Sequence, residues 1–294
     1  MPSLKWIENR CAGAIDASDV AVVVAHPDDE TIGCGALMSR LHNLNVVIVT
    51  DGAPRNGVNA RRAGFATPPD YAKARARELR AALAIAGIAE RQIFELGVRD
   101  GGVWHSLVPI THRLAHFFDE RGIVTVFTHA FEGGHSDHDG VAYCVHAAAG
   151  MLRRRVSTLI EMPFYHLSAK GPAFQSFCDR DEGVVMRLTP AERRAKIAMF
   201  MAYASQKQVL AQFDPGVERY RIARRYDFRT PPNRGSIRYV VDAETGLGLP
   251  DWTPPQQGQK LSCGNPGKTY AGPSPKSWST LRPRPERNRR AVLP

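Results

Sequence analysis

Two adjacent carboxylates near the start of the chain occupy positions that apolar packing alone would not select. The apolar run Val20–Ala25 is followed by His26, Pro27, Asp28 and Asp29. Neighbouring carboxylates repel each other unless one is protonated or a positive charge lies between them. A divalent cation would satisfy this condition if His26 and one carboxylate bound it and the other carboxylate handled a proton. An Asp pair that only caps the next helix is the alternative, because Asp is a favoured N-cap residue.

A second group of polar residues follows another apolar run. Residues 123–128 are apolar or β-branched, and the segment after them contains His129, His135, Asp137 and His138. Histidines three positions apart at the start of a helix can converge on one ion. In an open parallel sheet, ligands bind beyond the carboxyl ends of the strands, where both groups are predicted to lie. The sequence therefore predicts one site built from two distant segments.

The two motifs resemble the signatures of the zinc-dependent LmbE-like, or PIG-L, N-deacetylases. The family's His-Pro-Asp-Asp-Glu stands here as His26–Glu30, and its His-x-Asp-His stands as His135–His138. Weaker matches extend the resemblance over about residues 18–240; they are Thr50-Asp51-Gly52, Arg75 with Glu78, Leu96-Gly97, Asp100-Gly101, and Lys196 with Ser205-Gln206.

The resemblance implies a Zn²⁺ site with three protein ligands and one open position. Carried over to this chain, the ligands are His26, Asp29 and His138, and Asp28 is the general base on the attacking water. His135 is then expected to stabilise the developing oxyanion and to donate a proton. Which of the two adjacent carboxylates turns toward the metal follows from the resemblance and not from their spacing.

Residues near the predicted ligands are expected to support them. Asp137 is expected to hold one imidazole in its working tautomer. His129 is expected to contact the ligands or the substrate rather than the metal, because three ligands are already assigned. The chain departs from the family at Gly133, where some members have a tyrosine; a hydroxyl in that role would have to come from Tyr165 or Tyr203.

Three residues on other predicted elements or directly after them are candidates for substrate binding: Asp51, Arg75 and Asp100. The resemblance implies that Arg75 faces the substrate, whereas an ordinary ion pair with Glu78 one helical turn away is the alternative. Asp100 can accept hydrogen bonds from sugar hydroxyls, and a turn-forming Asp is its alternative.

The elements that must position these residues alternate between strands and helices. Periodicity predicts strands at 20–25, 46–50, 92–96, 123–128, 156–162 and 236–241, and helices at 4–16, 31–44, 71–86, 108–120, 141–151, 190–213 and 218–226. The alternation indicates an α/β protein, and the resemblance implies a Rossmann-like fold with a mostly parallel sheet flanked by helices. The loop 53–70, rich in Gly, Pro and Arg, is a candidate lid or recognition loop.

Composition limits the classes of protein to consider. The 294 residues are 43% hydrophobic, which supplies enough material for a core. No apolar run approaches the roughly 18 residues of a membrane span, and the N-terminal sequence lacks an apolar signal region, so a cytoplasmic protein is expected. The five cysteines are scattered and form no Cys-x-x-Cys pair, which is typical of reduced thiols.

The basic charge of the chain is concentrated at its C-terminal end. The net charge is +10, and residues 250–294 contain eight Lys or Arg against Asp251 and Glu286, giving +6. This Pro- and Gly-rich tail is predicted to be disordered or draped over the rest. We therefore expect a deacetylase domain over residues 1–249, with its core at 18–241, and a basic, irregular tail over 250–294.

The favoured hypothesis is a cytoplasmic, zinc-dependent hydrolase. It would remove the acetyl group from an N-acetylated amino sugar, such as an N-acetylglucosamine conjugate, with zinc-activated water. One alternative is a zinc-dependent amidase acting on a non-sugar amide. Another is a nucleic-acid-binding protein that acts through the tail, but the intact ligand set and general base argue against it. The expected partner is thus a small-molecule substrate rather than nucleic acid.

Overall fold

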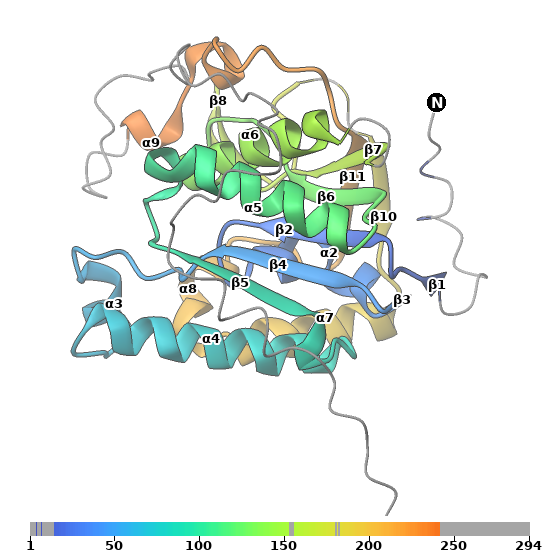
Figure 1. The fold of residues 1–294 in the computed structure, drawn as a ribbon. Coiled ribbons are helices and arrows are strands. Elements are labelled where there is room, and N and C mark those ends of the chain that lie inside the picture. The colour runs from blue at the N-terminus through green and yellow to red at the C-terminus, as the bar shows by residue number, and fades with distance from the viewer. Residues whose placement is uncertain are drawn as a thin grey trace, which may run out of the picture. The chain divides into compact units, whose positions relative to one another are not determined.

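A seven-stranded sheet in the order β10-β11-β7-β6-β2-β4-β5 forms the centre of the protein (Figure 1). The structure is a computed structural model that describes residues 4, 7, 15–152, 156–179, 181 and 183–241. The tail 250–294, Cys11, Cys263 and most of the helix expected at 4–16 lie outside the described residues.

Five strands of this sheet run parallel, and two antiparallel strands complete one edge. The parallel strands are β2 (Val20–Val24), β4 (Asn45–Thr50), β5 (Ile93–Val98), β6 (Thr125–His129) and β7 (Thr158–Met162), and the antiparallel ones are β10 (Val184–Arg187) and β11 (Val217–Ile222). Two separate strand pairs are β1 (Ile15–Asp16) with β3 (Leu41–His42) and β8 (Tyr165–Ser168) with β9 (Gly171–Phe174).

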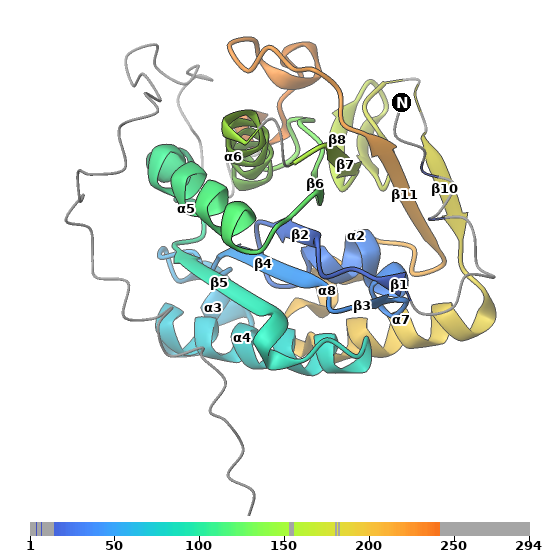
Figure 2. The same cartoon turned by 45° about the vertical axis from the view of Figure 1, so that its right-hand side comes forward.

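Helices cover both faces of the sheet, as Figures 1 and 2 show. One face carries α2 (Asp29–Met38), α4 (Pro68–Ile85) and α7 (Pro190–Ala202), and the other carries α5 (Leu107–Glu120) and α6 (Ser136–Met151). The short elements are α3 (Val58–Arg62), α8 (Lys207–Leu210), α9 (Arg238–Val241), η1 (Glu90–Gln92), η2 (Val103–Ser106), η3 (Ala204–Gln206) and η4 (Pro232–Gly235). The predicted α/β fold with a mostly parallel sheet is confirmed.

Local sequence explains why the main elements form where they do. Every residue of β2 and β4 is buried, as expected for central parallel strands covered on both faces. Helix α4 begins with Pro at its first position, after Thr67, whose side chain accepts a hydrogen bond from the Asp70 amide. Helix α7 begins with a capping box between Thr189 and Glu192.

The order of the strands reverses between β2 and β6, so their carboxyl ends form a switch point of the sheet. The chain moves from β2 to β4 and β5 on one side and then returns to β6 and β7 on the other. Strands β2 and β6 are parallel neighbours, with Val22 opposite Phe127. The two loops that follow them therefore leave the sheet side by side, which is the usual position of a ligand site in such sheets.

Helix α2 is broken at Cys34, where φ is −145° and ψ is 27°. The Glu218 carboxylate accepts a hydrogen bond from the Ala36 amide after the break, at 2.7 Å. Lys196 donates to the Ile32 carbonyl before the break at 2.8 Å and pairs with Glu218. The ion pair thus replaces hydrogen bonds that the broken helix cannot make itself.

Several element predictions were wrong. The helix expected at 218–226 is strand β11 followed by irregular chain, and the strand expected at 236–241 contains helix α9. The helix expected at 31–44 ends at Met38, and the loop 53–70 contains α3 and the start of α4. The Arg-rich sequence of this segment suggested a helix, but Glu218 and Arg221 are buried in ion pairs with Lys196 and Glu161.

Within the described ranges, no helix has both the length and the apolar character that a membrane span requires.

Candidate metal centre

The three predicted ligands come together where the loops after β2 and β6 meet. His26 Nδ1 lies 3.2 Å from Asp29 Oδ2, His138 Nε2 lies 3.3 Å from Asp29 Oδ1, and the two imidazole nitrogens are 3.3 Å apart. A tetrahedral ion with bonds of 2.0–2.1 Å has ligand atoms about 3.3 Å apart. All three side chains are buried. This donor set therefore fits a divalent cation such as zinc.

Other trios of possible ligands overlap with this one. His135 joins His26 and His138, His129 joins Asp29 and His138, and Asp100 with Asp137 joins His26. The His129 trio is the poorest, because His129 Nε2 already accepts a hydrogen bond from the Ala25 amide at 2.8 Å. His129 is completely buried, and its ring stacks on that of His138 with centroids 4.0 Å apart. It supports His138 from beneath the site.

Asp28 occupies the N-cap position of α2, but its side chain does not cap the helix. Its backbone has a φ of 125°, which is rare for a residue with a side chain. The Glu30 carboxylate holds this conformation by accepting a hydrogen bond from the Asp28 amide at 3.0 Å. The Asp28 carboxylate instead lies 3.0 Å from Arg75 Nη2. Burial raises the pKa of Asp28 to about 8, although Arg75 opposes this shift.

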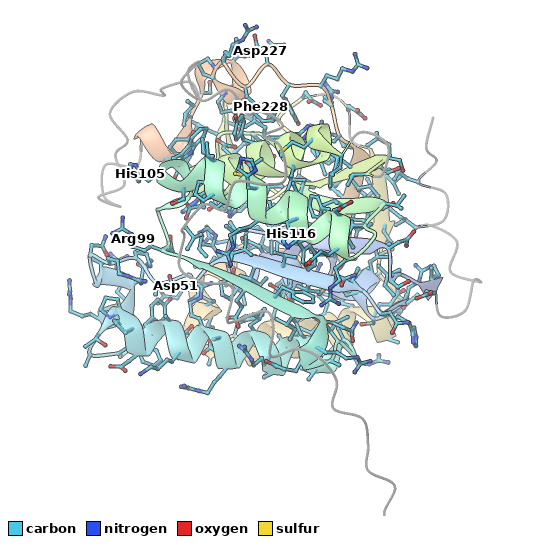
Figure 3. The ribbon with its side chains drawn as sticks, in the orientation of Figure 1. Asp51, Arg99, His105, His116, Asp227 and Phe228 are labelled. Atoms are coloured by element: carbon cyan, nitrogen blue, oxygen red, sulfur yellow. The ribbon has the colours of Figure 1, made fainter. Side chains whose placement is uncertain are left out.

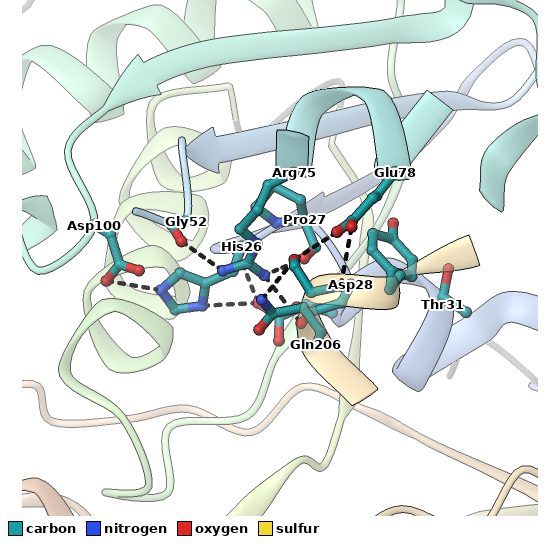
Figure 4. A network of polar contacts seen from close by, with 12 residues as sticks. His26, Pro27, Asp28, Thr31, Gly52, Arg75, Glu78, Asp100 and Gln206 are labelled. Atoms are coloured by element: carbon teal, nitrogen blue, oxygen red, sulfur yellow. Dashed lines mark hydrogen bonds and ion pairs between the residues drawn. The ribbon is translucent and has the colours of Figure 1, made fainter. Parts of the chain in front are cut away.

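The Arg75 guanidinium contacts other groups of the protein, as Figure 4 shows. Besides pairing with Asp28, its guanidinium donates to the Gly52 carbonyl at 2.6 Å and to the Pro27 carbonyl. A Cβ atom on Gly52, whose φ is 60°, would lie 2.5 Å from the Arg75 guanidinium. Only glycine therefore fits there. Glu78 accepts hydrogen bonds from Ser205 (N 2.9 Å, Oγ 2.6 Å), a contact that places η3 against α4.

His135 is held in one tautomer by the backbone. It is the N-cap residue of α6, and its Nδ1 accepts a hydrogen bond from the Asp137 amide at 3.1 Å. The proton of the neutral ring therefore resides on Nε2. Burial, together with the neighbouring His26 and His138, lowers the pKa of His135 to about 4. At neutral pH this side chain is a neutral hydrogen-bond donor beside the candidate ligands.

Two carboxylates face the other nitrogen of His26. Asp137 lies 3.4 Å and Asp100 lies 3.6 Å from His26 Nε2. Asp137 also accepts hydrogen bonds from the amides of Gly101 (2.6 Å) and Val103 (3.2 Å), so it joins the loop after β5 to α6. Although burial acts to raise the pKa of Asp100, attraction to His26 prevails and lowers it to about 2. The two carboxylates can therefore orient the His26 ring.

Asp51 shapes the turn at the end of β4. Its carboxylate accepts hydrogen bonds from the amides of Ala53 at 3.2 Å and Asp100 at 3.3 Å, and it pairs with Arg55. Figure 3 shows Asp51 near Arg99, at the ends of the paired strands β4 and β5. The substrate-binding roles of Asp51, Arg75 and Asp100 stay predictions.

Glu30 had no predicted role, but its side chain stabilises the loop that carries Asp28. Its carboxylate accepts hydrogen bonds from Tyr203 and Thr31, each at 2.5 Å, in addition to that from Asp28. The Tyr203 side chain is therefore buried in the core, where its hydroxyl binds Glu30. Of the two tyrosines considered as a substitute for the family's hydroxyl, only Tyr165 lies beside the imidazoles, with its ring 5.4 Å from that of His138.

Comparisons with known proteins agree with this arrangement. Residues 21–149 match the family model PIG-L, described as GlcNAc-PI de-N-acetylase. A search of curated proteins finds no significant match.

Three solved structures share the fold. The zinc-inhibited form of teicoplanin deacetylase Orf2 is 15% identical, with a TM-score of 0.50 over 70% of this chain and 99% of that one. The A40926 pseudoaglycone deacetylase Dbv21 is 19% identical, with a TM-score of 0.52 over 67% and 85%. The N,N′-diacetylchitobiose deacetylase from Pyrococcus horikoshii is 14% identical, with a TM-score of 0.52 over 76% and 93%. The predicted resemblance is confirmed: residues 21–149 of this chain match the PIG-L family model.

Proposed function

We propose that this protein is a zinc-dependent N-deacetylase that hydrolyses the acetamide of an N-acetylated amino sugar or its conjugate. The observation that carries the proposal is the convergence of His26, Asp29 and His138. The two imidazole nitrogens are 3.3 Å apart, and each lies 3.2 or 3.3 Å from one of the two Asp29 oxygens. Asp28 and His135 lie beside this set and have the properties of a base and a hydrogen-bond donor. The PIG-L match supports the same reaction.

A divalent cation bound by the three ligands would polarise the substrate carbonyl and make water a stronger nucleophile at neutral pH. Asp28 accepts the proton of the attacking water, since its side chain is fixed by Arg75 and does not cap the helix. Arg75 and a bound cation would both favour its ionised form, against the effect of burial. The same carboxyl group then returns a proton to the departing amine. His135 donates its Nε2 proton in a hydrogen bond to the oxygen on which negative charge develops.

The supporting residues keep these groups in position. Asp137 and Asp100 hold His26 through Nε2, so that Nδ1 points toward Asp29 and His138. His129 stacks beneath His138 and contacts Asp29 at 3.6 Å. Because most of these side chains are buried, little reorganisation is needed when the substrate binds.

The sugar substrate and the cytoplasmic location belong to this proposal. Structural neighbours are named as deacetylases of teicoplanin and of N,N′-diacetylchitobiose, and this supports an N-acetyl sugar over a non-sugar amide. The nucleic-acid alternative depended on the basic tail, which lies outside the described residues.

An amine-release assay tests the function. The zinc-loaded protein would be offered N-acetylglucosamine conjugates and, as a comparison, N-acetylated amino acids, before and after treatment with a chelator. We expect amine release from the sugars, its loss on chelation and its recovery when zinc is restored. Release only from the amino acids would favour the amidase, and no release from any substrate in the zinc-loaded protein would contradict the proposal.

A further inference from the structure

A second cavity lies between the C-terminal half of α6 and the chain that follows β11. Its volume is about 650 Å³, within the range of roughly 300–1,000 Å³ that small-molecule sites occupy. None of the residues that line it belongs to the candidate metal centre. They include Tyr143 and His146 of α6, Thr158 at the start of β7, and residues 222–226 and Phe228.

The cavity and the metal centre lie at opposite ends of the parallel strands. The predicted ligands follow the carboxyl ends of β2 and β6, whereas Thr158 is the first residue of β7. Strands β6 and β7 are parallel, with Thr125 opposite Thr158. Along α6, His146 is about 12 Å from His138 at a rise of roughly 1.5 Å per residue. A small molecule in the cavity would therefore occupy a second site and not an extension of the first.

Aromatic side chains form one wall of this cavity. The Phe228 ring lies edge to face against the rings of Tyr143 and His146, with centroids 5.3 Å apart in both pairs. The Tyr226 ring lies 5.5 Å from that of Phe228. Figure 3 shows Phe228 beside α6, and all four side chains are partly exposed. They offer flat apolar surfaces on which a planar ring can stack.

His146 adds an unsatisfied polar group to this wall. Its Nε2 is buried and makes no hydrogen bond to the described part of the chain. Glu161 lies 3.9 Å from this atom, beyond hydrogen-bond distance, and pairs with Arg221 at 2.7 Å. Burial lowers the pKa of His146 to about 4, so at pH 7 the neutral imidazole has one donor and one acceptor nitrogen. A ligand with polar groups therefore suits the wall better than a purely apolar one.

The charge of the lining favours an anion. Its charged residues are Arg224 and Arg225, and no acidic residue of the described chain lines the cavity. Arg224 pairs with Asp179 and Asp181, each at 3.2 Å. Arg225 is exposed, and within the described ranges its side chain makes no ion pair or hydrogen bond. Its guanidinium can therefore bind two oxygens of a phosphate or carboxylate.

We propose that this cavity, the α6 cavity, is a second ligand site that binds a planar aromatic ring bearing a phosphate or carboxylate. The ring stacks on the aromatic wall, and the anionic group pairs with Arg225. A nucleotide and an aromatic acid share this chemistry. The inference goes beyond the proposed deacetylase function and does not depend on it.

Calorimetry with the full-length, zinc-loaded protein tests the site. One series compares AMP with adenosine and inorganic phosphate, and a second compares indole-3-acetate with indole-3-acetamide and acetate. In each series only the first compound has both the ring and the negative charge. We expect AMP or indole-3-acetate to bind at least about 10-fold more tightly than its two counterparts, because each of these lacks either the charged hydrogen bonds or the stacking. The series that shows the difference identifies the class of ligand.

Variants of the lining make the result specific. Arg225→Gln should weaken the binding by about 10- to 100-fold, the range for a hydrogen bond to a charged group, and Arg225→Lys should retain part of it. Phe228→Leu removes the ring but keeps an apolar side chain, and it should weaken binding by about 10-fold. Arg229→Gln is the matched control, because it changes another exposed arginine of the segment, which pairs with Asp227, and it should leave binding unchanged. Zinc content would show that the metal centre is intact in every variant.

The chelated protein separates this site from the metal centre, where a phosphate or carboxylate could also bind zinc. Binding in the α6 cavity should survive chelation and depend on Arg225. The inference would be overturned if wild type bound neither AMP nor indole-3-acetate at millimolar concentration, or bound the ringless anions equally well. Affinity that is unchanged in Arg225→Gln would also overturn it, and its loss on chelation would then place the ligand on the zinc. Because no amine release is measured, failure of the deacetylase proposal would leave this inference standing.

Discussion

The ammonium of Lys196 lies 2.8 Å from Glu218 Oε1, and both side chains are completely buried. The pair joins α7 to β11 and supplies hydrogen bonds to both sides of the break in α2. Because α2 begins at Asp29, this distant pair sets the path of the helix that follows the first motif. The pair also gives a structural role to Lys196, one of the weaker matches to the family.

Lys196→Ala should destabilise the protein by about 3–5 kcal/mol, because it leaves the Glu218 charge buried and unpaired. Urea denaturation would measure the change. Lys170→Ala, at an exposed lysine, is the matched control and should stay within about 0.5 kcal/mol of wild type. Equal stability of the two variants would contradict this account of the pair.

His26→Ala and His138→Ala should each lose most of the bound zinc, because a catalytic site with three protein ligands cannot spare one. Elemental analysis of the purified proteins would measure it. His116→Ala removes an exposed histidine of α5 (Figure 3) and should keep the wild-type zinc content. Full occupancy in both ligand variants would disprove the assignment.

Asp28→Asn should keep zinc and lose about 10² to 10⁴ in turnover, because the amide cannot accept the proton of the attacking water. Zinc content and kcat would be measured on the same preparation. If zinc were lost instead, the roles of Asp28 and Asp29 would be exchanged.

His135→Ala should keep zinc and fold normally but lose about 10² to 10³ in kcat, the usual cost of one oxyanion donor. The structure gives the reason: Nδ1 is used by the Asp137 amide, so Nε2–H is the group that faces the substrate. Parallel loss of zinc would make His135 a fourth ligand in a closed site, and unchanged kcat would remove it from the mechanism.

Stability should fall on acidification partly because of His146 on α6. Burial lowers its pKa to about 4, whereas an unfolded histidine titrates near 6.5. Between these values the unfolded state binds more protons, so the contribution is present above about pH 6.5 and is lost as the pH falls toward 4.

Urea denaturation of wild type and His146→Gln at pH 7.5 and pH 5 would test this. Wild type should lose about 2 kcal/mol more than the variant on going to pH 5. His116→Gln, at an exposed position, should behave as wild type does. Equal losses in wild type and His146→Gln would show that His146 does not titrate in this range.

The parts of the fold that the sequence predicted are those with local signals. Each parallel strand contains a short stretch of apolar residues, and the polar residues that follow two of these strands mark their carboxyl ends. Since parallel neighbours bring their ends together, the meeting of His26 with His138 could be predicted without knowing the order of all strands.

The parts that were missed depend on pairs of residues far apart in the chain. Glu218 and Arg221 were assigned to a helix because their partners, Lys196 and Glu161, lie 22 and 60 positions away and could not be identified from the sequence. The contacts of Arg75 with the Gly52 and Pro27 carbonyls could not be predicted either, because these partners also lie far from Arg75 in the sequence. Burial of a charge is decided by its partner, and periodicity carries no information about partners.

Residues 232–239 pack against Gly133, whose carbonyl accepts a hydrogen bond from the Arg238 amide at 2.8 Å. The surroundings of the candidate metal centre therefore come from two stretches of chain that can change independently. The candidate metal ligands and the proposed base follow β2 and β6, whereas a segment about a hundred residues farther along packs beside the second of these loops. Substitutions or insertions in that segment can alter which molecules fit without disturbing the motifs. Proteins that share this chemistry can therefore diverge in selectivity by revising their C-terminal segments alone.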